Sequence, residues 1–146
     1  MEDRITVTFD TSILVAAARS RLGASFELIS SIPDPRFEIC LSVALYLEWQ
    51  DVLTRPEHLP PGQTAEDALG FLRFLASQAR LQEVYYLWRP YLPDASDDMI
   101  LELAVAANCK YIVTHNIRHF RGCEQFGIAA IAPRDFLRLV NEGANL

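Results

Sequence analysis

Four acidic side chains in three separate segments have the types and spacing that could hold a divalent metal ion. Asp10 directly follows the apolar run from Ile5 to Phe9, Glu48 lies within a later apolar segment, and Asp94 and Asp97 stand three residues apart. Carboxylates that gather without a cysteine or histidine cluster favour a hard cation such as Mg²⁺. A cation of this kind supports chemistry on phosphate groups. The acids therefore predict a metal-dependent reaction on a phosphoester.

Each acid also has an ordinary structural use. Asp10 could cap the helix expected after it, and Glu48 could be a surface residue. Asp94 could begin a turn, while Asp97 and its neighbour Asp98 would suit the positive end of a helix dipole. The sites nevertheless fall largely at strand ends or at the adjoining helix starts, and in a parallel sheet those positions converge on one edge. Carboxylates grouped there would repel one another unless a cation lay between them.

The elements that must position these acids alternate between strands and helices. Mainly apolar runs predict strands at residues 5–9, 37–41, 84–88, 111–114 and 128–131. Apolar residues at helical spacing predict helices at 11–21, 25–32, 42–53, 64–80, 97–107 and 134–140. Thr64 with Asp67 forms an expected capping box, Ser96 is an expected cap, and Pro133 suits a first turn. The alternation indicates an α/β fold with a parallel sheet covered on both faces.

Composition favours a single domain that spans residues 1–146. The chain is 51% hydrophobic and contains no linker or apolar run long enough to cross a bilayer. Glu2 and Asp3 precede the first apolar residues, which argues against a signal peptide. Its three cysteines, at positions 40, 109 and 123, lack CxxC spacing. Free thiols in a reducing cytoplasm are therefore expected.

The net charge of −6 excludes a general nucleic-acid coat but not a nuclease, because an acid cluster inflates the negative count. Polar groups that could position a phosphate follow the strand expected at 111–114: the hydroxyl of Thr114, the amide of Asn116 and the guanidinium of Arg118. His115 and His119 have no partner at metal-ligand spacing, so we expect them to be solvent-exposed.

Taken together, these segments resemble a PIN domain, in particular the bacterial and archaeal branch of toxin–antitoxin toxins related to VapC. The likeness covers almost the whole chain and rests on the order and spacing of several blocks: residues 7–12 (Val-Thr-Phe-Asp-Thr-Ser), Leu41-Ser42 through Leu47-Glu48, Leu92-Pro93-Asp94 through Asp97-Asp98, Leu103-Ala104, and residues 111–116 (Tyr-Ile-Val-Thr-His-Asn). The resemblance implies a three-layer α/β/α sandwich around a parallel sheet of four to five strands.

The resemblance also assigns the acids. The family's first, second and third acids fall on Asp10, Glu48 and Asp97, and Asp94 matches an additional acid of this branch. Asp10 and Asp97 are expected to ligate Mg²⁺ or Mn²⁺. The chain departs from the fullest family pattern at the fourth acid, where Asn116 stands in place of an aspartate. A weaker affinity for a second metal is therefore expected.

The resulting hypothesis is a Mg²⁺- or Mn²⁺-dependent endoribonuclease, the toxin of a toxin–antitoxin pair. Its expected partners are RNA, a cognate antitoxin and a second copy of the chain. The alternative is a degenerate domain that binds RNA or a protein without cleavage, which Asn116 favours. A haloacid dehalogenase-like phosphatase would need an aspartate where Ser12 stands, and a response-regulator receiver domain would need a lysine after a late strand, yet Lys110 precedes one.

Overall fold

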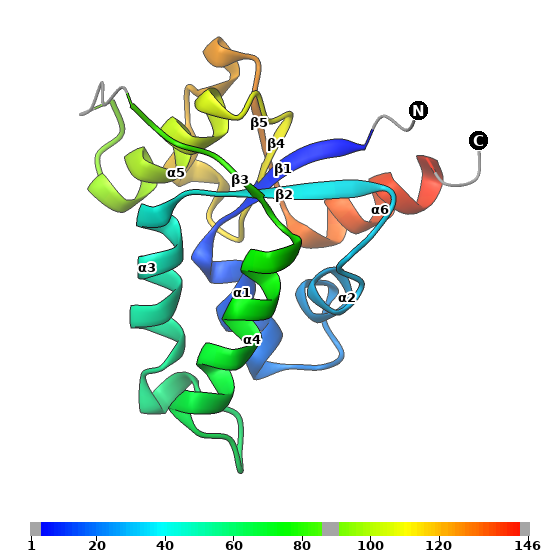
Figure 1. Ribbon diagram of the computed structural model, residues 1–146. Helices are drawn as coiled ribbons and strands as arrows, with labels where there is room; N and C mark the ends of the chain where they lie inside the picture. The colour runs from blue at the N-terminus through cyan, green and yellow to red at the C-terminus, as the bar shows by residue number, and fades with distance from the viewer. Residues whose placement is uncertain (1–3, 86–90, 144–146) are drawn as a thin grey trace.

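The apolar runs of the sequence form the strands of one parallel sheet. The computed structural model describes residues 4–85 and 91–143, and Figure 1 shows the arrangement of its elements. The strands are β1 (Ile5–Phe9), β2 (Phe37–Leu41), β3 (Arg80–Leu81), β4 (Tyr111–Val113) and β5 (Ala129–Ile131). The α-helices are α1 (Thr11–Arg19), α2 (Ala24–Ser30), α3 (Val43–Leu53), α4 (Ala65–Gln78), α5 (Ala95–Ala106) and α6 (Pro133–Gly143). Short 3₁₀ turns are η1 (Pro56–His58), η2 (Ile117–Phe120) and η3 (Cys123–Phe126).

Helices cover both faces of this sheet. The strand order is β3-β2-β1-β4-β5, and every pairing is parallel. In Figure 1, α5 lies on one side of the sheet, and α1 and α6 lie on the other. The α5 helix packs against β1, β2 and β4, whereas α1 packs against β1. The fold is therefore the expected three-layer α/β/α sandwich.

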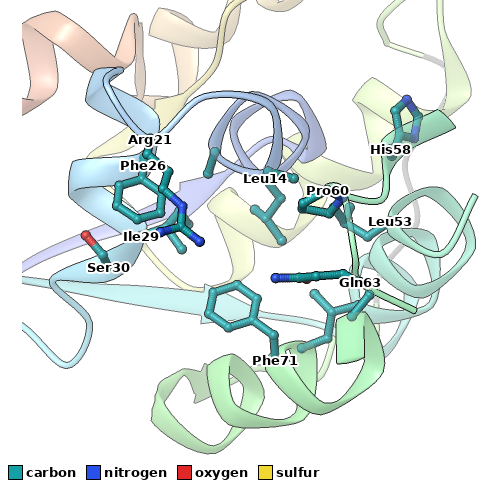
Figure 2. Close-up of a pocket in the computed structure, with 14 residues that line it drawn as sticks. Leu14, Arg21, Phe26, Ile29, Ser30, Leu53, His58, Pro60, Gln63 and Phe71 are labelled. Atoms are coloured by element: carbon teal, nitrogen blue, oxygen red, sulfur yellow. The ribbon is translucent and has the colours of Figure 1, made fainter. Parts of the chain in front are cut away.

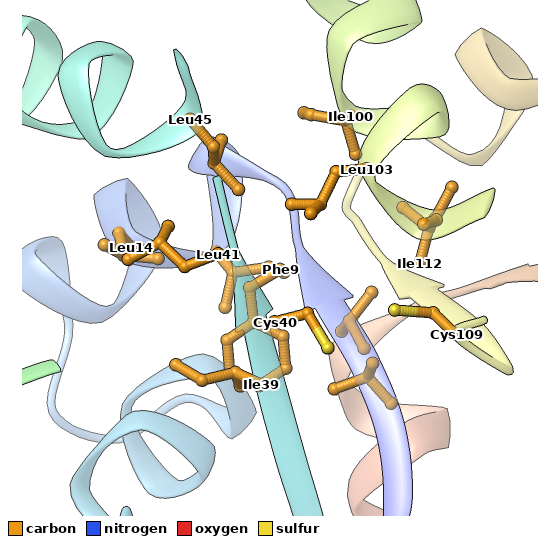
Figure 3. Packing of buried hydrophobic residues seen from close by; sticks show 14 of the residues in the cluster. Phe9, Leu14, Ile39, Cys40, Leu41, Leu45, Ile100, Leu103, Cys109 and Ile112 are labelled. Carbon is orange, nitrogen blue, oxygen red and sulfur yellow. The ribbon is translucent and has the colours of Figure 1, made fainter. Parts of the chain in front are cut away.

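The two faces of the sheet differ in chemistry because successive strand side chains point to opposite sides. Phe37 contacts both Phe9 and Phe136 of α6 through its ring, so these aromatic residues build the core on the α6 side. Cys109 lies against the buried Thr8 hydroxyl on the opposite side. Figure 3 shows the two parts of the core, with Phe9, Leu14 and Leu41 in one and Ile100, Leu103 and Ile112 in the other.

The carboxyl edge of the sheet gathers three chain segments at the point where strands end. Asp10 follows β1, Ser42 follows β2 and Thr114 follows β4. The backbone fixes this register, since Asp10 N donates to Val113 O at 2.9 Å and Thr114 N donates to Ile131 O at 2.9 Å. Ser42 caps α3, because its side chain accepts a hydrogen bond from Leu45 N. The α3 helix that carries Glu48 therefore also begins at this edge.

The third strand is the main error of the sequence-based prediction. A strand was expected at 84–88, but β3 comprises Arg80–Leu81, and neither Val84 nor Tyr85 lies in a strand. Residues 86–88 lie outside the described residues. The β3 strand is an exposed edge strand of two residues, so it has no buried apolar run that a pattern could detect.

The start of α5 is also corrected. Ser96 was expected to cap a helix beginning at Asp97, but the helix begins at Ala95 and Asp94 is its cap, with Oδ1 accepting from Ser96 N at 2.8 Å. The capping box of Thr64 and Asp67 is confirmed, although α4 ends at Gln78. The other boundaries differ from the prediction by two to three residues at most, as at Arg19, Ser30 and Gly143.

All three cysteines are free and buried, as expected. Within residues 4–85 and 91–143, no helix has the length and apolar character needed to cross a membrane.

Candidate metal and phosphate site

Asp10 occupies the N-cap position of α1, but its carboxylate does not cap the helix. Its side chain accepts no capping hydrogen bond. Instead, Oδ2 accepts hydrogen bonds from the hydroxyls of Ser12, at 2.8 Å, and Thr114, at 2.7 Å. The residue is 7% exposed. The ordinary structural use considered for Asp10 is therefore excluded, and a nearly buried carboxylate stands at the end of β1 held by two hydroxyls.

Glu48 reaches the same edge from the second turn of α3. Its Oε2 accepts a short hydrogen bond from the hydroxyl of Thr11, the residue that follows Asp10. Because Thr11 and Ser12 are consecutive at the start of α1, one helical turn holds the carboxylates of both Asp10 and Glu48. The side chain of Glu48 is thus partly buried and directed inward, which a free surface residue would not be.

The three aspartates around the start of α5 have different surroundings. Asp94 is exposed and caps the helix. Asp98 is 1% exposed, and its Oδ1 accepts hydrogen bonds from Leu92 N at 2.8 Å and Tyr91 N at 3.2 Å. Asp98 therefore anchors the segment that enters α5. Asp97, between them, is 9% exposed, and no backbone N–H of residues 4–85 or 91–143 donates to its carboxylate.

Electrostatics connect Asp97 with the other three acids. The pKa of Asp97 is raised to about 6, mainly by burial and then by the negative charges of Asp10, Asp94 and Glu48, while His119 acts in the opposite direction. His119 Nδ1 lies 3.6 Å from Asp97 Oδ2. Coulombic effects of this kind require charges that are close together in a partly desolvated space. Asp97 is thus within electrostatic range of Asp10, Asp94 and Glu48, and these four residues are called the acid cluster below.

The donor set suits a hydrated hard cation better than a closed metal cage. Among the residues described, no three histidine, cysteine, aspartate or glutamate side chains are placed to hold a metal ion by themselves. Protein donors fix Asp10 Oδ2, Glu48 Oε2 and Asp94 Oδ1, and no described residue donates to the second oxygen of these carboxylates. Mg²⁺ commonly takes one or two carboxylates and keeps several waters. The acids present fit that mode of binding.

The three groups expected to position phosphate lie in different settings. Thr114 is fully buried, and its hydroxyl donates to Asp10 while accepting from Asn116 N at 2.9 Å. Its observed contacts therefore orient an acid. The side chains of Asn116 and of Arg118, on η2, are exposed at the same edge.

The expected solvent exposure of both histidines is confirmed, but each also has a neighbour. His119 faces Asp97, and His115 Nε2 lies 3.1 Å from Ser25 Oγ of α2. The sequence argument gave no role to the hydroxyls of Thr11 and Ser12, and it placed His119 only among the basic residues expected to flank the acids. The sequence feature that could have identified the two hydroxyls is their position directly after Asp10. For His119, the sequence offers only its position a few residues after the end of a strand.

The sequence model of the PIN domain family matches residues 6–118 of the chain. That range begins in β1, ends in η2 and includes all four clustered acids. A search of curated proteins finds no match.

Proposed function

The chain belongs to the PIN domain family, and from this premise we propose that it is a metal-dependent ribonuclease that hydrolyses RNA phosphodiester bonds. PIN domains are typically metal-dependent nucleases. The observation that carries the proposal is the placement of Asp10 and Glu48 at the carboxyl edge, each held through one oxygen by hydroxyl groups, and the raised pKa of the nearby Asp97 supports it. A cluster that repels itself in this way is stabilised by a divalent cation, and phosphate chemistry is the usual use of such a cation.

Within this proposal, Asp10 and Asp97 would hold Mg²⁺ or Mn²⁺, which would supply positive charge for the phosphoryl oxygens and make water more acidic. Thr114 and Ser12 fix Asp10 through Oδ2 and leave Oδ1 for ligation. Glu48, fixed by Thr11 through Oε2, directs Oε1 to a water molecule and takes up its proton as the water oxygen bonds to phosphorus. The bond from phosphorus to the leaving oxygen breaks in the same step, and that oxygen takes a proton from solvent.

The remaining groups position the water and the substrate. Asp94 orients a water molecule with Oδ2, since Oδ1 is used by Ser96 N. Asn116 and Arg118 are exposed beside the acids and hold the RNA backbone, Asn116 through its amide and Arg118 through paired N–H groups that match phosphate geometry. His119 adds a further donor next to Asp97.

The proposal is tested by cleavage of labelled RNA oligonucleotides with Mg²⁺ or Mn²⁺, comparing wild type with Asp10→Asn and Asp97→Asn. Loss of one electrostatic group of this kind lowers the rate by about 10²–10³-fold. Asp135→Asn is the matched control, because Asp135 is a half-exposed aspartate on α6. Equal cleavage by wild type and both site variants, with thermal unfolding showing all of them folded, would contradict the proposal.

A second candidate function is a domain that binds RNA without cutting it. It is favoured by Asn116, which adds no charge where the fullest family pattern has an acid, and by the lack of three grouped metal ligands among the described residues. Calorimetric titration separates the two candidates. No heat of Mg²⁺ or Mn²⁺ binding, even with RNA present, supports the binding domain, whereas saturable metal binding supports the nuclease.

We further propose that the chain is the toxin of a toxin–antitoxin pair. A cognate antitoxin would cover the acids with a basic side chain and place an apolar segment beside them. Val43 and Leu47, 78% and 56% exposed on α3 near Glu48, offer an apolar surface for such a segment or for a second copy of the chain. Light scattering of the V43K/L47K variant, alone and with the product of a neighbouring gene, tests both partners.

A further inference from the structure

A hollow of about 310 Å³ lies between α1, α2 and α4, apart from the acid cluster (Figure 2). Its walls are mainly apolar: Leu14 and Ala17 of α1, Phe26 and Ile29 of α2, and Phe71 of α4. This volume is at the lower end of the range for small-molecule sites, which are typically apolar with a few polar groups that set orientation. The ring of Phe71 is 45% exposed, so the hollow is open to solvent on the α4 side.

The polar groups that line the hollow divide into two kinds. Ser30 Oγ donates to Glu27 O at 3.2 Å, and His58 Nδ1 lies 2.8 Å from Val52 O, so both have protein partners. Arg21 and Gln63 are exposed to solvent, and their side chains have no hydrogen bond or ion pair with any described residue. Figure 2 shows them reaching into the hollow from opposite sides.

The described side chains that line this hollow include a positive charge but no negative one. Arg21 is a permanent cation, and Gln63 brings an amide N–H donor. The described residues that line the hollow include no aspartate or glutamate, although the chain as a whole carries a net charge of −6. A guanidinium with a second donor beside an apolar wall matches a carboxylate that carries an apolar body.

We propose that this hollow binds a small monocarboxylate with an apolar chain or ring, of which a medium-chain fatty acid is the simplest example. The carboxylate pairs with Arg21 and accepts from Gln63, while the apolar body lies against α1 and Phe71. This inference is independent of the proposed nuclease function, because none of the four acids lines the hollow.

The test is calorimetric titration of the full chain with decanoate, below its micelle concentration, compared with decan-1-ol. We expect saturable binding of one decanoate and at least tenfold weaker binding of the alcohol, which lacks the charge. The Arg21→Gln variant should bind decanoate at least tenfold more weakly and decan-1-ol unchanged. Arg19→Gln is the matched control, because Arg19 is exposed at the end of α1, two residues before Arg21, and does not line the hollow.

A second variant, Ala17→Leu, fills the hollow from α1 and should weaken both probes. Backbone amide NMR shifts with decanoate should be confined to α1, α2, α4 and the 58–63 segment, which locates the ligand without relying on any variant. The proposal is overturned if decanoate does not bind, if decan-1-ol binds equally well, if Arg19→Gln has the effect expected of Arg21→Gln, or if the shifts lie elsewhere.

Discussion

One buried aspartate at each edge of the parallel sheet shows how differently such a side chain can be surrounded: Asp34 at the amino edge and Asp97 at the carboxyl edge. At the amino edge, before β2, Asp34 is 5% exposed and accepts from Arg36 Nε at 3.0 Å and Arg36 Nη2 at 2.8 Å. Burial raises the pKa of Asp34, but the hydrogen bonds from Arg36 and Ser31 outweigh burial and lower the pKa overall. At the carboxyl edge, Asp97 is similarly buried, and the basic side chain that lies within 4 Å of it among the described residues is the exposed His119.

The difference separates a structural acid from an acid available for function. A carboxylate paired with arginine adds stability at neutral pH and offers no vacant ligand oxygen. At the carboxyl edge, Asp10 and Glu48 accept hydrogen bonds from neutral hydroxyl groups, which orient them without cancelling their charge. Lys110 illustrates the same division, because it precedes β4 and so lies at the amino edge, away from Asp10. The receiver-domain interpretation, which needs a lysine beside the acids, is thereby excluded.

The largest effect is expected at the amino edge. Asp34→Ala leaves the partly buried Arg36 without its carboxylate partner and should lower the free energy of unfolding by about 3 kcal/mol. Denaturant titration at pH 7 measures this loss. Asp51→Ala, which removes an exposed pair with Arg55, is the control and should cost less than about 1 kcal/mol. An equal loss in both variants would remove the contrast between buried and exposed pairs.

At the carboxyl edge, replacing an aspartate should raise the free energy of unfolding instead of lowering it. Asp97→Asn removes one charge from a self-repelling cluster and should raise the unfolding free energy of the metal-free protein by about 1–3 kcal/mol at pH 7.5, given a folded pKa of about 6. Because a raised pKa favours the protonated folded form, this difference from wild type should be present above pH 6 and vanish near pH 4. Thermal unfolding with EDTA measures it, and a destabilised variant would refute this account.

The same titration should govern metal binding. The pKa of Asp97 is about 6, so at lower pH the side chain is mainly protonated and should lose its ability to ligate a cation. Mg²⁺ affinity should therefore fall by about tenfold between pH 6 and pH 5, measured by calorimetry. The Asp97→Asn variant should show a flatter pH dependence over that interval, and identical profiles for the two proteins would assign the effect to another group.

The smallest effect is expected from the hydroxyl that orients Asp10. Thr114→Val keeps the volume of a fully buried side chain but removes a donor to Asp10 and an acceptor for Asn116 N. A loss of about 1–2 kcal/mol in stability is expected, together with cleavage slowed by about tenfold. Thr114→Ser, which keeps the hydroxyl, should restore cleavage. Failure of the serine variant to do so would mean that packing, and not the hydrogen bond, is what matters.

The sequence predicted the central strands because burial on both faces requires mainly apolar runs, as in β1, β2 and β4. It missed β3 because two exposed residues at a sheet edge carry no such requirement. The start of α5 was misplaced because Asp94, Ser96 and Asp97 are all good capping residues within four positions. Hydrogen bonding, and not the pattern, selects among them.

The candidate site could likewise be predicted only in part. That Asp10 and the acids at α5 share an edge was predicted because parallel strands end at one edge of a sheet. Glu48 was a candidate acid from the start, and the resemblance assigned it as the family's second acid. The hydroxyl contacts of Thr11 and Ser12 could not be inferred, because they depend on how α1 faces α3. The separate surroundings of Asp97 and Asp98 likewise depend on the path of the chain at 91–92, which no periodicity encodes.

The neighbouring aspartates at the start of α5 have a practical consequence for screening. Since the Asp98 carboxylate fastens the incoming chain at Tyr91 and Leu92, its removal would shift Asp94 and Asp97 along with that chain. A survey scored only by lost turnover would place Asp98 among the reactive groups. Measuring the thermal unfolding temperature together with turnover separates the two residues. An asparagine at 97 should give an inactive protein that unfolds at a higher temperature, whereas an asparagine at 98 should lower the unfolding temperature.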